Sequence, residues 1–195
     1  IGINTVYSIA NLSVNSANAT AQLAANLTVL QSVNINSGTL DANNLNITIG
    51  GSWTNGSTFT PGTGTVIFDG TGTQTITKSG GETFNNVTVN KPSGTVSLAN
   101  NIQVNTTLTM TAGNIDCGSN ALTLGVSAAS VGTLTYTAGT IIGNFKRWIN
   151  STGVGILFPI GTSSYYRSAL LTFINLAGGT VNANFVSTDP GNNGL

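Results

Sequence analysis

Hydrophobic residues alternate with polar ones in short bursts along most of this chain. Each burst covers three to five residues and is bounded by Asn, Gly or Ser. Alternation with a period of two places one set of side chains on a single face of a strand, and the bounding residues favour turns. The pattern therefore predicts many short strands that each bury one face. The clearest bursts lie at residues 12–14, 27–29, 33–35 and 47–49.

The chain also contains an internal duplication. Residues 11–50 align with residues 86–125 without a gap, and 12 of the 40 aligned pairs are identical. The identical pairs are strand hydrophobes, such as Val14 with Val89, and turn residues, while most other pairs exchange similar side chains. The alignment predicts a tandem repeat whose second copy starts at Asn86, the partner of Asn11.

Short strands separated by turn residues and repeated in tandem are typical of a parallel β-solenoid, or β-helix, in which each coil stacks on the previous one. Hairpins in a four-stranded sandwich give similar spacing and are the competing interpretation. The repeat lacks long paired strands, which favours the solenoid. A third partial copy places Leu134 in the position of Leu108, so we expect a general turn as long as the step from Leu108 to Leu134, built from three strands.

Residues 51–81 lie between the two copies. Their central stretch, TVIFDGTGTQTI, has two alternating segments on either side of Asp69 and Gly70. Asp-Gly is a favoured two-residue hairpin turn with positive φ. We therefore expect a hairpin insertion over residues 51–81, with Asp69 and Gly70 as its turn residues.

Two residue types recur at matching places in the repeat. Gly38 and Gly113 are aligned, and Gly139 has the matching place in the third partial copy, LTYTAGTII. Glycine at such places indicates a left-handed or strained backbone at a corner of the solenoid. Asp41 and Asp116 are also aligned, which indicates a turn role made twice rather than catalysis.

The last part of the chain has a different pattern, with more charged and aromatic residues and four longer alternating segments. Terminal repeats are expected to be atypical because they cover the open end of a stack. We therefore predict a solenoid over residues 1–143 and a small antiparallel β-sandwich-like module or cap over residues 144–195. The four segments are 145–149, 155–158, 169–174 and 180–186.

Composition narrows the functional classes. Only 5% of the residues are charged, with five Lys and Arg against five Asp and Glu, whereas soluble domains carry about 25%. The polar surface must consist of Asn, Thr, Ser and Gly, which supports an all-β fold. We find no basic stripe for nucleic acid and no apolar run near the ~20 residues of a membrane-spanning helix. The chain begins at Ile1 without a charged leader, so we expect a mature or excised fragment.

Groups that support catalysis or metal binding are scarce. The chain has no His, which removes His-based triads and His-ligated metals. Its few carboxylates do not form a recognisable calcium loop. We expect no catalytic residue, no metal and no cofactor. The single Cys117 aligns with Ala42, so we expect it to fill a small buried site.

One cluster is a candidate recognition surface. Trp148, Tyr165, Tyr166 and Arg167 combine aromatic rings with a cation, and such groups stack on sugar rings. The competing interpretation is a sandwich core with a solvated rim.

Alternating threonines provide a second idea about recognition. They occur at 107–111 and at 133–137, and a flat threonine face could bind ice. The first copy carries Ser32, Asn34 and Asn36 at the positions aligned with 107–111, which argues against this function.

Long stretches of the chain resemble repetitive cell-surface proteins of Bacteroidota, which are adhesin-like chains. The resemblance covers roughly residues 7–190 and implies export by the type IX secretion system and a role in gliding or attachment. It indicates a structural repeat and no biochemical activity. The stretches that carry it are GGSWTNGSTFTPGTGTVIFDGTGTQTI, FNNVTVNKPSGTVSLANNIQVNTTLTMTAGNIDCGSNALTLG and FPIGTSSYYRSALLTF.

We therefore expect a non-enzymatic structural or adhesive module on the outer surface of a bacterium. It would be a rigid repeat of an adhesin or a subunit of an extracellular filament. Its partners would be neighbouring repeats of a longer chain or further copies added end to end. The apolar residues 1–14 would then be a donated strand or the first coil. The alternative is a carbohydrate-binding module that contacts surface glycans through the aromatic cluster.

Overall fold

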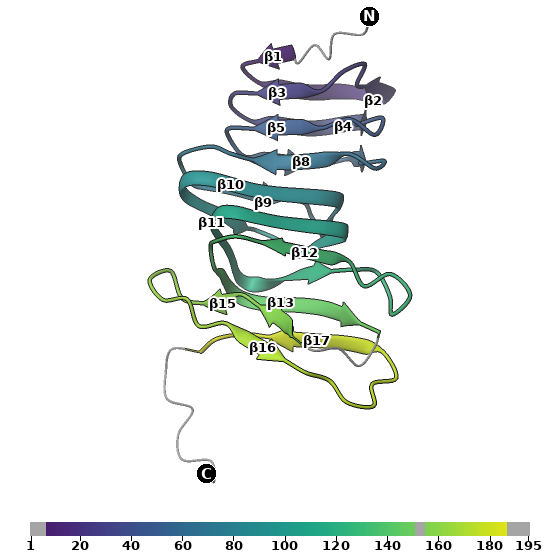
Figure 1. The fold of residues 1–195 in the computed structure, drawn as a ribbon. Coiled ribbons are helices and arrows are strands. Elements are labelled where there is room, and N and C mark those ends of the chain that lie inside the picture. The colour runs from purple at the N-terminus through teal and green to yellow at the C-terminus, as the bar shows by residue number, and fades with distance from the viewer. Residues whose placement is uncertain (1–6, 151–154, 187–195) are drawn as a thin grey trace, which may run out of the picture.

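The computed structural model describes residues 7–150 and 155–186, and these residues contain strands but no helix. They form a parallel β-solenoid of about seven turns, with a small antiparallel part at its carboxyl-terminal end (Figure 1). The predicted all-β solenoid is therefore confirmed, and the four-stranded sandwich is wrong for the repeat region.

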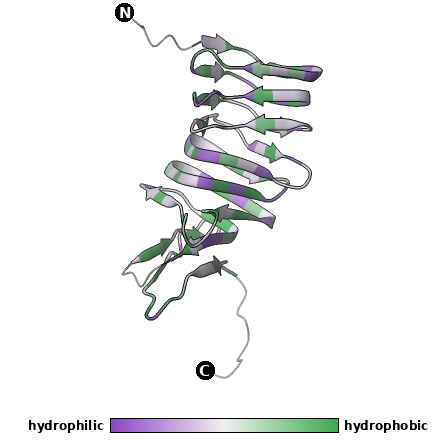
Figure 2. Cartoon of the chain, turned by 90° about the vertical axis from the view of Figure 1, so that its right-hand side faces the viewer, coloured by the Kyte–Doolittle hydropathy of each residue, from purple (hydrophilic) through white to green (hydrophobic). Residues whose placement is uncertain are grey.

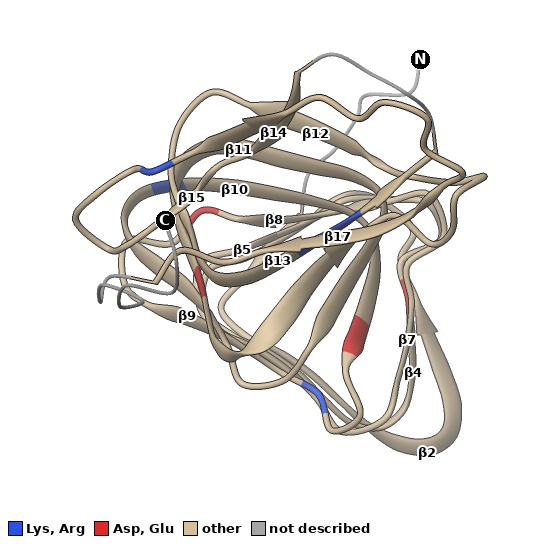
Figure 3. Cartoon of the chain, turned by 90° about the horizontal axis from the view of Figure 1, so that it is seen from below, with Lys and Arg blue, Asp and Glu red and all other residues tan. Residues whose placement is uncertain are grey.

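Each turn adds a strand to three sides of the stack, which we call faces A, B and C (Figure 3 looks along the axis). Face A contains β1 (Tyr7–Ile9), β3 (Leu27–Val29), β5 (Ile47–Ile49), β8 (Thr65–Phe68), residues 86–89 of β10 (Glu82–Leu98), residues 107–110 of β11 (Ile102–Leu124) and β12 (Thr133–Tyr136). Face B contains the start of β2 (Leu12–Gln22), the start of β4 (Val33–Asp41), β6 (Trp53–Asn55), β9 (Gln74–Thr77), the end of β10, residues 115–116 of β11, the start of β13 (Ile141–Ile149) and β15 (Ile160–Gly161). Face C contains the ends of β2 and β4, β7 (Thr58–Thr60), the start of β10, both ends of β11 and the rest of β13.

The length of a turn follows from the strand register. On face A the successive partners are Leu27, Ile47, Val66, Val87 and Leu108, which are nearly evenly spaced in the sequence. The next step on this face, from Leu108 to Leu134, is longer because residues 125–132 form an extra loop. The expectation that the step from Leu108 to Leu134 gives the general turn length is therefore wrong.

The duplicated copies are not stacked in register. Four turns after Leu12 on face B comes Leu98, whereas the aligned partner of Leu12 is Val87, which lies one face earlier on face A. The offset between the two copies thus falls one strand short of four turns. The unit that the duplication repeats is a strand with its corner rather than a whole turn.

Residues 51–81 form ordinary solenoid turns, and the expected hairpin is wrong. β8 pairs with β5 and β10, whereas β9 pairs with β6 and β10, and all of these pairings are parallel. Asp69 and Gly70 form the corner between β8 and β9, and neither has a positive φ. Gly70 lies so close to the preceding turn that a Cβ atom would clash with the carbonyl oxygen of Gly50. Close stacking therefore explains this glycine.

The other residues expected at corners lie between strands of different faces. Gly38, Gly113 and Gly139 have φ of 81°, 89° and 102°, a region that side chains with a Cβ rarely adopt. Asp41 Oδ1 accepts a hydrogen bond from the N–H of Asn43 at 2.8 Å, and Asp116 Oδ1 accepts one from Gly118 at 2.9 Å. The two aspartates thus make the same local turn, Asp41 after a strand of face C and Asp116 after a strand of face B.

Alternate side chains of each strand point into the stack and form its core. In β5, for example, Ile47 and Ile49 are fully buried while Thr48 between them is half-buried. Figure 2 shows the resulting alternation of hydrophobic and hydrophilic positions along the strands. Burial of such a side chain contributes about 1.5–3 kcal/mol, and the columns of aliphatic residues hold successive turns together. Trp53, Phe59, Phe68 and Phe84 form an aromatic cluster within the core.

Asparagine side chains join consecutive turns at the corners. Asn26 Oδ1 accepts a hydrogen bond from the N–H of Asn46 at 2.9 Å, and Asn46 Oδ1 accepts one from the N–H of Thr65 at 3.0 Å. These bonds satisfy backbone donors where the strand ladder ends. They explain why a chain with so few charges contains so many asparagines.

The antiparallel part follows the last turns of the solenoid. β13 pairs in parallel with β11 through Arg147, and β17 (Gly179–Ala183) pairs antiparallel with the end of β13. β14 (Ile156–Phe158) and β16 (Ala169–Leu171) form a separate two-stranded antiparallel sheet. Parallel pairing therefore continues past residue 143, and the change of direction takes place along β13. At the other end, β1 and β2 form the first coil, while residues 1–6 lie outside the described residues.

Candidate functional site

The predicted aromatic and basic cluster is only partly assembled. Tyr165 and Arg167 lie together on the connection from β15 to β16, with the guanidinium carbon 5.0 Å from the centre of the tyrosine ring. Tyr165 is 61% exposed, so one face of its ring is open to a ligand. Trp148 lies on β13 and pairs with Thr180, and in the described part of the chain no ring contact joins it to these residues.

Tyr136 on β12 is a member of this cluster that the sequence analysis missed. Its ring stacks on Tyr166 with the centroids 5.8 Å apart and the planes 12° apart. Its hydroxyl donates a hydrogen bond to the carbonyl of Gly139 at 2.9 Å, and burial together with the neighbouring Tyr166 hydroxyl raises its pKa. This ring contact holds the cluster against β12, the last strand of face A. Only the period-two pattern of the third partial copy marks Tyr136, and that pattern does not reveal the contact.

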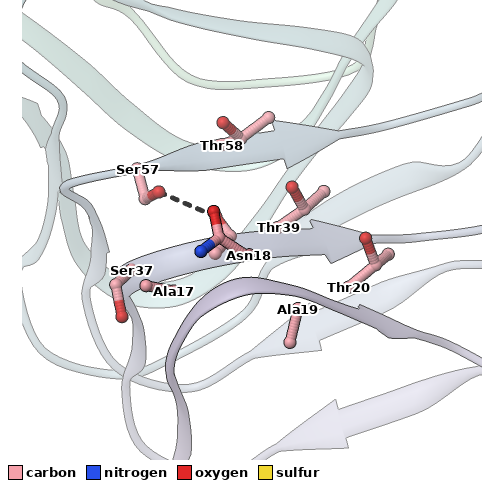
Figure 4. A pocket seen from close by; sticks show the side chains of 9 residues that line it. Ala17, Asn18, Ala19, Thr20, Ser37, Thr39, Ser57 and Thr58 are labelled. Atoms are coloured by element: carbon pink, nitrogen blue, oxygen red, sulfur yellow. Dashed lines mark hydrogen bonds between the residues drawn. The ribbon is translucent and has the colours of Figure 1, made fainter.

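A shallow groove lies at the corner between faces B and C in the first three turns. Its volume is about 420 Å³, and Thr20, Thr39 and Thr58 follow one another along it on successive strands (Figure 4). The Ser57 hydroxyl donates to the carbonyl of Gly38 at 2.7 Å and closes one side. The residues around the groove carry no charge, so it offers hydroxyl groups, the side-chain amide of Asn18 and backbone atoms.

Threonines also form a column on the outside of face A. The strand register aligns Thr28, Thr48, Thr88, Thr109 and Thr135, with Ile67 between the second and third. The aligned Asn34 lies on face B instead. The sequence argument against a threonine face used the wrong register, and the structure does not test ice binding.

Among the described residues two charged side chains are buried, one in the fourth turn and one in the fifth. Lys91 is 1% exposed; its ammonium donates to the carbonyl of Gly70 and to Gln74 Oε1, both at 2.6 Å. Gln74 Nε2 in turn donates to the carbonyls of Ile49 and Gly51 at 2.7 and 2.6 Å. Burial lowers the pKa of Lys91, and the nearby Asp69 opposes this shift.

Glu82 is the second buried charge and is 5% exposed. Its Oε2 accepts hydrogen bonds from Trp53 Nε1 and Asn55 Nδ2, both at 2.7 Å. Its Oε1 accepts one from the N–H of Thr83 at 3.1 Å. The sequence analysis gave Glu82 no role, because an isolated glutamate after two glycines carries no local signal of burial.

Catalytic and metal-binding arrangements are not apparent in the ordered strands and corners described above. Residues 7–150 and 155–186 contain no group of three or more His, Cys, Asp or Glu able to hold a metal. Cys117 is buried, as expected, and burial raises the pKa of its thiol to about 12, which makes it a poor nucleophile. The few charged residues are spread over several elements, with Lys146 and Arg147 adjacent on β13 (Figure 3).

The described residues also contain no helix long and apolar enough to cross a membrane.

Comparison of this chain with protein-family profiles, curated proteins and solved structures gives no significant match.

Proposed function

We propose that this chain is a non-enzymatic structural module, a rigid repeat unit of an extracellular adhesin or filament on a bacterial surface. The observation that carries the proposal is the continuous parallel ladder of face A, which runs from β1 to β12 with one strand per turn. Such a ladder makes a stiff rod because each turn is hydrogen-bonded to both neighbours. A rod of this kind can hold a binding tip away from a cell.

The first turn offers a way to lengthen the rod. β1 pairs only with β3 and β2 only with β4 in the part of the chain that the structure describes. The N–H of Tyr7 and of Leu12 point to the second turn, so the backbone groups of Ser8 and Ser13 point to the open edge. Free strand edges accept further strands. The added strands would come from preceding repeats or from another copy of this chain.

Negative-stain imaging with size-exclusion light scattering tests the polymer form of this proposal. We expect concentration-dependent rods in the wild type and monomers in a Ser8→Pro/Ser13→Pro variant, because proline removes edge donors and no ladder bond. A Ser163→Pro variant in the loop between β15 and β16, whose exposed residue donates to no backbone group within the described residues, is the control and should still assemble. Wild-type protein that stays strictly monomeric at high concentration would exclude assembly through copies.

A carbohydrate-binding module is the second candidate. The exposed ring of Tyr165 beside Arg167 favours it, since flat aromatic faces and guanidinium groups bind sugars. A glycan array with Tyr165→Ala and Trp148→Ala variants tests it. Because Trp148 lies apart from the tyrosines, binding that needs Tyr165 but not Trp148 is the expected result.

A further inference from the structure

One step of the solenoid lacks a backbone ladder. On face C, the ends of β2 and β4 and the strand β7 pair in sequence, and the start of β10 pairs with the start of β11. Between β7 and the start of β10, the described residues form no strand pairing. The side chains of Phe59 and Phe84 still meet behind this break, with ring centroids 6.0 Å apart. The core is therefore closed while the outer surface is split.

A groove of about 420 Å³ occupies the break. Small-molecule sites typically have volumes of ~300–1,000 Å³, so the groove is large enough for a small ligand. It is lined by polar groups of three consecutive turns and by one aromatic ring. The residues used below are Asn55, Phe59, Lys78, Glu82, Thr83 and Asn105.

Glu82 provides a fixed hydrogen-bond acceptor in the groove. Trp53 and Asn55 both donate to Oε2 and hold the carboxylate in place, while Oε1 accepts only from the N–H of Thr83. A carboxylate has about four acceptor positions, so Oε1 keeps capacity for a ligand donor. No ion pair to Glu82 is present within the described residues, and a buried carboxylate gains from a further donor.

Lys78 gives the groove a donor of opposite charge. Its ammonium donates to the carbonyl of Ser57 and retains two further protons. An anionic ligand would be repelled by Glu82 and a cationic one by Lys78, which leaves a neutral ligand. A ligand that both donates and accepts hydrogen bonds fits the pair.

We propose that this groove binds a neutral saccharide. Sugar hydroxyls donate to Glu82 and accept from Lys78 and from the amide of Asn105, and the half-buried ring of Phe59 packs against the C–H face of the sugar. This site is separate from the Tyr165 cluster, and it stands whether or not the chain assembles into rods.

The test is binding of neutral and charged oligosaccharides, measured on an array and by titration calorimetry. We expect neutral glycans to bind the wild type and Lys78→Met and Glu82→Gln to weaken binding tenfold or more. Glu82→Gln keeps an oxygen for Trp53 and Asn55, and Lys78→Met leaves the buried network intact, so at least one variant should stay folded. Thr39→Ala, in the uncharged corner groove of equal volume, is the matched control and should bind normally.

Three results would overturn the proposal. They are no binding of any neutral glycan, binding unaffected in a folded Lys78→Met variant, or binding that Tyr165→Ala abolishes while both groove variants keep it. The last result would place sugar recognition at the aromatic cluster instead.

Discussion

The first three turns of the solenoid and the two that follow solve the same stacking problem in different ways. In the first three, the steps between paired residues are short, such as Val33 to Trp53 on face B, and every face keeps its ladder. In the fourth turn the step on face B from Trp53 to Ile76 is longer, and face C loses its ladder. Asparagine amides join corners in both regions, but among the described residues the buried charges, Glu82 and Lys91, lie in the longer turns.

The comparison shows how a longer turn changes the hydrogen bonding of the stack. Extra residues leave backbone groups that no neighbouring strand can reach, and a long charged side chain reaches them instead. Lys91 does this for the carbonyl of Gly70. Glu82 instead accepts hydrogen bonds from the buried side chains of Trp53 and Asn55. Removing one hydrogen-bond partner of a buried charge lowers protein stability strongly, because the charge then lacks compensation. We therefore expect substitutions of the buried charges in the longer turns to be poorly tolerated, while the effect at a glycine corner depends on the space around it.

The largest expected difference concerns two glycine corners with nearly equal φ. Gly38 in the second turn has φ +81° and a Cβ there would clash with the carbonyl oxygen of Ser16; Gly80 in the fourth turn has φ +84° and open space. We expect Gly38→Ala to lower the free energy of unfolding by about 4 kcal/mol, from strain and overpacking together. Gly80→Ala should cost about 1 kcal/mol from strain alone. Urea denaturation measures both, and equal losses would contradict the close packing of the first turns.

Removing the buried carboxylate should have the next largest effect. Glu82→Ala leaves the donors of Trp53 and Asn55 without an acceptor, which costs about 3 kcal/mol. Glu82→Gln retains an oxygen and should cost about 1 kcal/mol. Thermal unfolding with tryptophan fluorescence reports on this site, although both tryptophans of the chain contribute to the signal. Equal losses of stability in Glu82→Ala and Glu82→Gln would show that the hydrogen bonds to Trp53 and Asn55 do not stabilise the solenoid where the face C ladder is interrupted.

Removing an asparagine amide at a corner of the short turns should lower stability less than removing Glu82. Asn46→Ala removes one acceptor from the half-buried N–H of Thr65 and should cost about 1 kcal/mol. The matched control is Asn85→Ala, whose side chain accepts only from the hydroxyl of the exposed Thr106. Chemical denaturation of both variants should give the larger loss for Asn46. A loss above that of Glu82→Ala would reverse the proposed contrast between the short and long turns.

The smallest effect is a difference in pH dependence. Burial raises the pKa of Cys117 from 9.0 to about 12, so the folded protein holds this proton longer than the unfolded one and stability falls as pH rises above 9.0. Burial lowers the pKa of Lys91 from 10.5, so stability due to this group rises with pH up to 10.5.

Stability measured from pH 8 to about pH 10.5 separates the two groups, a window set by their usual pKa values. Cys117→Ala, which installs the residue of the first copy, should flatten the fall, and Lys91→Met should steepen it. Identical pH profiles for the two variants would show that one of these side chains is not buried as described.

Local patterns in the sequence correctly predicted the short strands, because alternation such as Ile47-Thr48-Ile49 depends only on which residues face the core. They also predicted the corners at Gly38 and Asp41, whose conformations are local. The hairpin at Asp69 and Gly70 was wrong because the preferred turn of an Asp-Gly pair yields to the pairing of its flanking strands with other turns. The predicted turn length was wrong because it was taken from the one step on face A that carries an extra loop.

The site was harder to predict than the fold. Glu82 and Lys91 are single charged residues without a motif, and their burial depends on the lengths of neighbouring turns. The contact between Tyr136 and Tyr166 joins residues on different elements that no sequence period connects. The cluster around Tyr165 was found because its aromatic residues are consecutive in the sequence. Trp148 was included only because it is also aromatic.

The stacking register is the central claim, and a spin-label distance measurement in a Cys117→Ala background tests it most directly. Labels at Thr28 and Thr109 lie four strands apart in one column of face A, which corresponds to ~19 Å at a strand spacing of ~4.8 Å. Labels at Asn34 and Thr109 lie on different faces and should be clearly farther apart. If Asn34 is instead the nearer partner, the duplicated copies stack in register and this account of the fold is contradicted.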